Sequence, residues 1–599
     1  MISGAVNKYT YKLSKQYGVD NDLVLKYFYM MGKPGIHFIE WPTGSGKSLL
    51  ISILAFLYPI TASLRSYIFC RTYTQINEYL ERLVRIAFSL DIYPKISVLV
   101  GKDLACPYGD IYNNEISYLF CKYLGNGIRC PDYRKMLNNK GAIRLEKIFS
   151  QTDKSRVEDI IEFFIDNGIC PYYSLRRIGQ ESEIILSTYH YLLNGLLPRK
   201  DNIFKYFVFI DEGHNLVDHF IESNLIRFDK EALIRLSRVL EIDRTLLSEN
   251  VFKNGIGVDS NLSKEYIILL LKKMKEKFIE HYVDSLIIND ISLNSGSESD
   301  NPEKNTVVKL VNLDLDSIFH VVDEDEYIKI YLLPKFTFFR NFLNSSYSTI
   351  IASATLSPYK FFSRVLKSLG IKKKFRKYSE PYLYNSLSSA KINIYVSRYV
   401  TSRYVNRTPD SFYFISDFSI KITRKTGIST ILFVPSLDIK EVMYSLIKES
   451  LLTGDLSDIG IFIDSNPSDI ENFLNEEKPS ILVMNQRGRY SEGINIFRTT
   501  NKAFNVVIYG LSIQPTDPLK DSLLSEFFGI KSNELFIYGY ILPAMIYFVQ
   551  SIGRIISRRA ELNLYILEKR ILKYLNSPVT PVWFRKLIKN SKISIVESI

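Results

Sequence analysis

The sequence lacks an apolar run long enough to span a membrane. Its longest such run, residues 49–64, is interrupted by Ser52, Pro59 and Thr61, and it falls short of the ~20 apolar residues that a transmembrane helix needs. Residues 1–20 also lack the apolar core and cleavage site of a secretory signal. We therefore expect no signal peptide, no transmembrane segment and a cytoplasmic location.

Cysteine and histidine are scarce, with five and six copies in 599 residues. No CxxC pair occurs, and the histidines show no metal-ligand spacing, so neither residue type indicates a metal site by its spacing alone. In the cytoplasm, free thiols or metal ligands are favoured over disulfides. Cys70 lies in an apolar stretch and is interpreted as core, whereas the other four fall in residues 98–171, a segment without sustained periodicity.

The composition is that of a folded protein with several domains. Hydrophobic residues make up 46% and charged residues 23% of the chain, and at ~150 residues per domain this length predicts three or four domains. The net charge of +12 is uneven, since residues 481–599 hold 16 Lys and Arg against 8 Asp and Glu. Such an excess favours a polyanionic partner, although a solvated basic face without a ligand is the alternative.

A glycine-rich turn connects an apolar strand pattern at residues 36–39 to a helical pattern at residues 49–57. Turns of this kind bind phosphate, because glycines let backbone amides approach an anion, the lysine reaches the terminal phosphates and the hydroxyl holds Mg²⁺. The general pattern has a glycine where this chain has Trp41, so an ordinary Gly/Ser turn is the alternative. The residues expected to bind nucleotide are Pro42, Thr43, Gly44, Ser45, Gly46, Lys47 and Ser48.

A second candidate element is the sequence DEGH at residues 211–214, which follows the apolar run 207–210. Carboxylates at the end of a buried strand point into the crevice where an α/β sheet binds its ligand. We expect Asp211 to hold Mg²⁺ together with Ser48, and Glu212 to deprotonate an attacking water. Alone, the sequence could be a turn or a helix cap, but together with the glycine-rich turn it indicates nucleoside triphosphate hydrolysis.

Alternation of strand and helix patterns predicts an α/β fold with parallel sheets. Residues 228–322 are instead mainly helical in periodicity, with a loop at residues 294–302. The expected strands are residues 36–39, 66–70, 184–187, 206–210, 349–352, 430–434, 459–463, 480–483 and 505–509.

Four short segments follow one another along the chain: PTGSGKS (42–48), DEGH (211–214), SATLSP (353–358) and QSIGR (550–554). In this order they resemble the motifs of the XPD/Rad3-like branch of superfamily 2 helicases, and the resemblance runs from about residue 36 to 585. The branch typically reads EXPTGTGKT at the first segment, so Trp41 agrees with it. Residues 170–173, 187–193 and 489–495 resemble further motifs of the branch.

The resemblance implies two RecA-like P-loop NTPase lobes, with a cysteine-rich Fe–S insertion and a helical, arch-like insertion in the first lobe. The expected boundaries are 1–105, 171–227 and 341–373 for the first lobe, 106–170 for the Fe–S domain, 228–340 for the arch-like insertion and 374–599 for the second lobe.

The resemblance also gives four cysteines a role as ligands of a [4Fe–4S] cluster. These are Cys106, Cys121, Cys130 and Cys170, and thiolates are the soft ligands that such a cluster requires. A zinc ion is the second choice and unliganded buried thiols are the third.

The family pattern QxxGRxxR places nucleotide-contacting residues at Gln550 and Arg554. Its last arginine is replaced by Ser557, with Arg558 next to it, and one residue of shift turns a helical side chain by ~100°. We therefore predict Arg554 as the arginine finger, with Arg558 as the alternative. Glu492 and Gly493 are expected to sense nucleotide and strand, and residues 353–355 to couple the two sites.

The function implied by the resemblance is that of an ATP- and Mg²⁺-dependent helicase or translocase moving 5′ to 3′ on single-stranded DNA. Forked duplex DNA would be its substrate, in the cytoplasm or an equivalent compartment that holds DNA. One alternative, motivated by Ser557, is a catalytically weakened ATP-binding protein that acts as a nucleic-acid scaffold. Another is a helicase-like ATPase that acts on RNA or on protein–DNA complexes.

Overall fold

The computed structural model divides the chain into two compact units. The first comprises Met1–Leu25, Ser52–Val208 and Asn215–Ser346, and the second comprises Lys26–Ile51, Phe209–His214 and Tyr347–Ile599. The structure describes residues 2–107, 121, 130–138, 156–197, 205–240, 261–281, 306, 309–310, 313–323, 327–333, 336–378, 392–454, 458–488, 502–556 and 562–596.

The first of two large sheets has seven strands in the order β10-β1-β9-β5-β2-β4-β3. The pairings β1–β9, β1–β10, β2–β4 and β3–β4 are parallel. Every residue of β1 and β2 is buried, as expected for parallel strands covered on both faces. The strands are β1 (Gly35–Glu40), β2 (Arg65–Cys70), β3 (Ile96–Val98), β4 (Ile184–Thr188), β5 (Tyr206–Ile210), β9 (Ser348–Ser353) and β10 (Phe375–Tyr378).

Helices follow these strands where the apolar periodicity predicts them. Helix α3 (Lys47–Ala62) follows β1, and α4 (Tyr73–Leu90) follows β2. At the start of α4, the Thr72 hydroxyl accepts from the backbone N–H of Gln75 and the Gln75 side chain accepts from Thr72 N–H. This reciprocal capping satisfies two backbone donors that the helix itself cannot pair.

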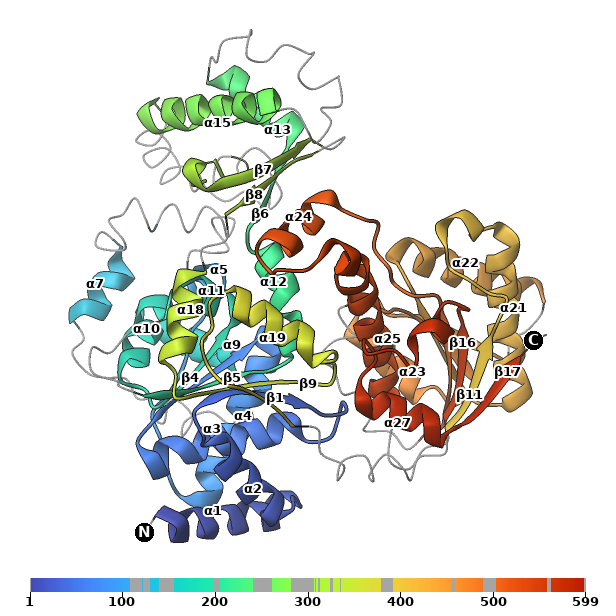
Figure 1. The fold of residues 1–599 in the computed structure, drawn as a ribbon, viewed down its shortest axis with the longest axis horizontal. Coiled ribbons are helices and arrows are strands. Elements are labelled where there is room, and N and C mark those ends of the chain that lie inside the picture. The colour runs from blue at the N-terminus through green and yellow to red at the C-terminus, as the bar shows by residue number, and fades with distance from the viewer. Residues whose placement is uncertain are drawn as a thin grey trace. The chain divides into compact units, whose positions relative to one another are not determined.

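The second sheet also has seven strands, in the order β13-β14-β12-β15-β16-β11-β17, and all its pairings are parallel. Figure 1 shows α21 (Pro409–Thr426) and α22 (Leu437–Thr453) on one side of this sheet, with α25 (Leu542–Ile555) and α27 (Val582–Asn590) on the other. The strands are β11 (Ile392–Ser397), β12 (Thr430–Val434), β13 (Gly460–Ile463), β14 (Ser480–Asn485), β15 (Phe504–Tyr509), β16 (Leu562–Leu567) and β17 (Lys592–Val596).

The insertion that we expected to be helical contains a sheet as well. Helices α13 (Lys230–Val239) and α15 (Asn261–His281) agree with the helical periodicity. They share a core with the antiparallel sheet β6-β8-β7, formed by β6 (Leu225–Asp229), β7 (Ile318–Asp323) and β8 (Tyr327–Leu332). The prediction of a mainly helical segment therefore missed these strands, which bury their apolar side chains against the helices.

One helical stretch, Ser532–Gly553, is long and apolar enough to cross a membrane by length and composition alone. The apolar runs considered from the sequence did not include this stretch. Its most apolar window is 72% buried inside the chain, as expected for the core helix of a folded domain. It includes a π-helical turn at Ile537–Ile541 and runs into α25.

Candidate functional site

The glycine-rich turn between β1 and α3 surrounds the ammonium group of Lys47. This group donates to the backbone carbonyls of Trp41 and Pro42, each at 3.2 Å, and the residue is only 7% exposed. Gly44 and Gly46 adopt φ values of 77° and 89°, in the left-handed region that favours glycine. The turn therefore holds one buried positive charge at the N-terminus of α3, an arrangement suited to binding phosphate.

The two residues expected to hold Mg²⁺ lie next to each other. The Ser48 hydroxyl donates to Asp211 Oδ2 at 3.2 Å. Ser48 comes from the first turn of α3, whereas Asp211 follows the C-terminal end of β5. A hydroxyl and a carboxylate are oxygen ligands of the kind that Mg²⁺ takes, so the donor set fits this ion.

A polar chain connects Glu212 to helix α25. The Ser353 hydroxyl donates to Glu212 Oε2 at 3.0 Å and lies 2.6 Å from His214 Nδ1. His214 Nε2 accepts from the Gln550 side-chain amide at 3.1 Å. Because an amide nitrogen only donates, a neutral His214 ring carries its proton on Nδ1. The structure thus joins residues from three of the sequence motifs into one chain that ends at Glu212.

Glu212 is held as a carboxylate. Its burial alone would raise the pKa, but hydrogen bonds from His214 and Ser353, together with the electrostatic influence of His214 and Lys47, outweigh burial and lower the pKa to about 2. Glu212 also has a φ of +49°, which is uncommon for a residue with a side chain and is typical of functional sites. The side chain is therefore a hydrogen-bond and proton acceptor at neutral pH.

Strand β1 contacts helix α27, and this contact was not predicted from the sequence. Glu40, the last residue of β1, is fully buried and accepts hydrogen bonds from the Ser357 hydroxyl, at 2.6 and 2.9 Å, and from the Val582 N–H at 3.1 Å. The adjacent Trp583 donates from its indole N–H to the Ala354 carbonyl at 2.7 Å. The residue pattern gave no signal for this contact, because its partners are 229 and 542 residues apart along the chain.

We expect Trp583→Ala to lower the thermal midpoint of unfolding markedly. Removal of a fully buried tryptophan leaves a cavity, which lowers the free energy of unfolding by about 3–5 kcal/mol. Trp583→Phe keeps most of the ring and should cost less. Tyr413→Ala, at an exposed position of α21, is the matched control and should leave the midpoint unchanged. Equal midpoints for Trp583→Ala and Tyr413→Ala would contradict the packing described here.

Other predicted site residues lie outside what the structure describes. Arg554 lies on α25, but its side chain is not among the described ones. Arg558, Glu492 and Gly493 are also outside the described residues. Their roles therefore stay predictions.

The four cysteines expected to bind a cluster are all among the described residues. Burial raises the pKa of the Cys170 thiol to about 12, and interactions with Cys130, Cys106 and Cys121 add to the rise. The Tyr173 hydroxyl lies 3.6 Å from Cys121 Sγ. Within the described ranges, no three His, Cys, Asp or Glu side chains form a group close enough to hold a metal ion. Thiolates are the donors that a soft metal centre takes, but the described thiols do not form a group that would hold one.

Two family models match the chain. Residues 68–233 match DEAD_2 and residues 420–586 match the helicase C-terminal domain. Among curated proteins, the chain is similar to the ATP-dependent DNA helicase XPD of Sulfolobus acidocaldarius, with 24% identity over 546 residues that cover 88% of this chain and 91% of that protein. It is also similar to the ATP-dependent DNA helicase CHL1 of Candida albicans, with 23% identity over 59% of this chain and half of that protein.

Solved structures share the fold. The structure titled XPD_Helicase matches with a TM-score of 0.66 and 19% identity, over 98% of this chain and 99% of that one. The structure titled XPD_APO matches with a TM-score of 0.56 and 17% identity, over 96% of this chain and all of the other. These structures therefore share the α/β fold of this chain, with one parallel sheet in each of two lobes.

Proposed function

The chain belongs to the XPD/Rad3-like branch of superfamily 2 helicases, and from this membership we propose that it is an ATP-dependent DNA helicase that moves 5′ to 3′ on single-stranded DNA. The observation that carries the proposal is the joined set of polar side chains around the glycine-rich turn. Lys47, the Ser48–Asp211 pair and the chain from Gln550 to Glu212 are the parts that ATP hydrolysis requires.

In the proposed reaction, the Glu212 carboxylate accepts a proton from a water molecule as the water oxygen bonds to the γ-phosphorus. The bond between that phosphorus and the bridging oxygen breaks, leaving ADP and inorganic phosphate. Lys47 stabilises the negative charge that develops on the phosphates. Ser48 and Asp211 would hold Mg²⁺, which supplies further charge neutralisation when bound.

We assign positioning roles to the side chains behind Glu212. Ser353 and His214 fix the carboxylate orientation through the hydrogen bonds described above, and Gln550 fixes the His214 ring. The family pattern adds an arginine from α25 or the residues after it, either Arg554 or Arg558, as the finger that stabilises the transferring phosphoryl group.

The DNA substrate is proposed from the names of the relatives and from the basic C-terminal part of the chain. Strand displacement tests it with duplexes that carry a 5′ or a 3′ single-stranded overhang, and with RNA duplexes of the same sequence. We expect unwinding of the 5′-overhang DNA alone, with binding that weakens as salt rises. Equal unwinding of the RNA duplexes would favour the alternative of a helicase-like ATPase that acts on RNA. A preference for the 3′ overhang would indicate movement from 3′ to 5′.

We also propose that Cys106, Cys121, Cys130 and Cys170 hold a [4Fe–4S] cluster. Protein purified without air should then contain about four iron atoms per chain and absorb visible light, and Cys170→Ser should lose both. Cys70→Ser is the matched control, because Cys70 is buried in strand β2. About one zinc and no iron per chain would instead indicate a tetrahedral zinc site.

A further inference from the structure

A basic and aromatic segment follows strand β11 and is not used by the proposed hydrolysis. Residues 398–407 read RYVTSRYVNR, with three arginines and no acidic residue. Tyr399 is 68% exposed, and Tyr404 and Val405 are each 83% exposed. Arg398 and Arg403 are exposed too. We refer to residues 398–407 as the Arg–Tyr segment.

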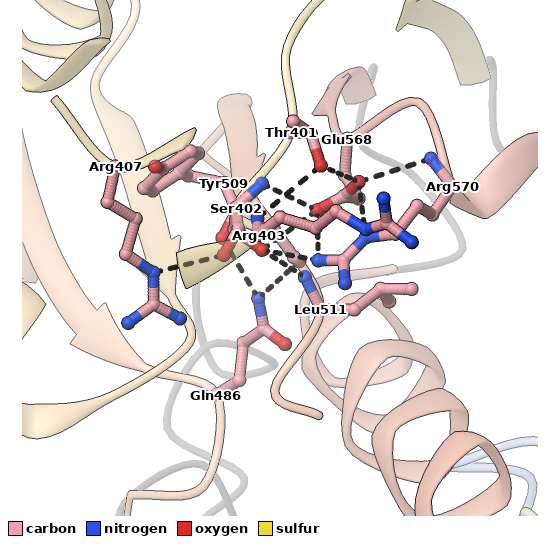
Figure 2. A network of polar contacts seen from close by, with 10 residues as sticks. Thr401, Ser402, Arg403, Arg407, Gln486, Tyr509, Leu511, Glu568 and Arg570 are labelled. Atoms are coloured by element: carbon pink, nitrogen blue, oxygen red, sulfur yellow. Dashed lines mark hydrogen bonds and ion pairs between the residues drawn. The ribbon is translucent and has the colours of Figure 1, made fainter. Parts of the chain in front are cut away.

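The backbone of the Arg–Tyr segment is fixed by the carboxylate of Glu568, which follows β16 and is fully buried. Glu568 accepts from the Thr401 hydroxyl at 3.1 Å, from the Ser402 N–H at 2.9 Å and from the Ser402 hydroxyl at 2.8 Å (Figure 2). Arg570 donates to Glu568 at 2.7 Å and to the Ser402 hydroxyl at 2.8 Å. Arg570 therefore neutralises the negative charge of the Glu568 carboxylate that holds the segment.

Two further contacts hold the segment to its neighbouring strands. The Lys569 N–H donates to the Val400 carbonyl at 2.7 Å. Gly510 follows β15 with a φ of +78°, and a Cβ there would lie 2.3 Å from the Ser402 side chain. Only glycine allows this close approach, so the segment is packed tightly against the end of β15.

The exposed tyrosine at the tip has a cationic neighbour. The Arg407 guanidinium lies 5.7 Å from the centre of the Tyr404 ring, and its Nε donates to the Ser402 carbonyl at 3.0 Å. Figure 2 shows Arg407 on the opposite side of Ser402 from Arg570. The Tyr404 ring is therefore exposed to solvent on a backbone segment that Arg407 and Arg570 fix from opposite sides. Because this segment is already ordered, it loses less conformational entropy when a ligand stacks on the ring.

We propose that the Arg–Tyr segment binds single-stranded DNA, with Tyr404 stacking on a base and Arg403 and Arg398 contacting phosphates; this rests on the proposed function. Exposed aromatic rings interleaved with arginines are what a single strand requires, since every base has a face that can stack and every linkage carries a charge. An acidic protein would use the arginines but would leave the aromatic faces without a matching partner.

The test measures binding of a fluorescent oligothymidylate by anisotropy at fixed salt, without nucleotide. Tyr404→Ala should weaken binding about tenfold, whereas Tyr413→Ala, which removes an exposed tyrosine from α21, should not. On an abasic strand of the same length, Tyr404→Ala and the unchanged protein should bind within about twofold, because no base remains to stack. Arg403→Ala should weaken both strands and reduce the salt slope by about one.

The proposal is overturned if Tyr404→Ala binds oligothymidylate as tightly as the unchanged protein does. It is also overturned if the loss is as large on the abasic strand, or if polyglutamate competes as well as oligothymidylate, because either result indicates a general anion-binding surface. These outcomes are separate from failure of the proposed function, since ATP turnover without DNA should be the same in Tyr404→Ala and in the unchanged protein.

Discussion

Glu212→Gln is expected to reduce ATP turnover by about a hundredfold or more. The substitution keeps the size of the side chain and leaves an oxygen that accepts from Ser353, but it removes the proton acceptor. Nucleotide affinity should change little, because Lys47 and the glycine-rich turn are untouched. The measurements are steady-state phosphate release and binding of a fluorescent nucleotide. Glu231→Gln, at an exposed position of α13, is the matched control and should retain full turnover.

The pH dependence of turnover gives a second check on Glu212. Its pKa is lowered from an ordinary value of 4.5 to about 2, so the ionised form is favoured in the folded chain. Its contribution to stability is present above about pH 4.5 and is lost only as the pH falls toward about 2. Turnover between about pH 8 and pH 5 should therefore show no loss due to protonation of Glu212.

Full turnover in the Glu212→Gln variant would show that Glu212 is not the proton acceptor of the site.

Lys47→Ala is expected to reduce turnover strongly for a different reason. The lysine supplies the positive charge of the turn, and loss of one preorganised donor at the reacting group reduces turnover by about a hundred- to a thousandfold. Nucleotide affinity should fall as well, in contrast to Glu212→Gln. The same two assays separate the variants, and Lys421→Ala, which removes an exposed lysine of α21, is the control.

A loss of fold in Lys47→Ala would give the same readout, because Lys47 also bonds the carbonyls of Trp41 and Pro42. The thermal midpoint of unfolding should therefore be measured beside turnover. An unchanged midpoint with unchanged nucleotide affinity would contradict the assignment of this turn as the phosphate-binding element.

Much of the fold could be predicted from local pattern. The strands predicted at residues 36–39 and 430–434 are short, mainly apolar runs between turn residues, and the structure confirms them as Gly35–Glu40 and Thr430–Val434. Five strands of the two parallel sheets were missed, namely Ile96–Val98, Phe375–Tyr378, Ile392–Ser397, Leu562–Leu567 and Lys592–Val596. The first two are too short to show a period, and all five are strands because a neighbouring strand pairs with them.

The candidate site was predictable to the extent that its residues lie in motifs. The glycine-rich turn and the DEGH sequence each combine residue types whose chemistry is evident from their order. Glu40 lies beside the turn, yet its contact with Val582 depends on how distant segments pack. The anchoring of Ser402 by Glu568 escaped prediction for the same reason. Local sequence gives residue chemistry, whereas tertiary packing decides which partner a buried carboxylate finds.

The most direct measurement of the central claim is ATP turnover at saturating ATP and Mg²⁺, with and without oligothymidylate. If the hydrogen-bonded side chains from Gln550 to Glu212 belong to the ATPase site of a motor, DNA should raise turnover at least about tenfold. Glu212→Gln should remove this increase. Tight DNA binding with no rise in turnover would contradict the account and would identify the chain as an ATP-binding nucleic-acid scaffold.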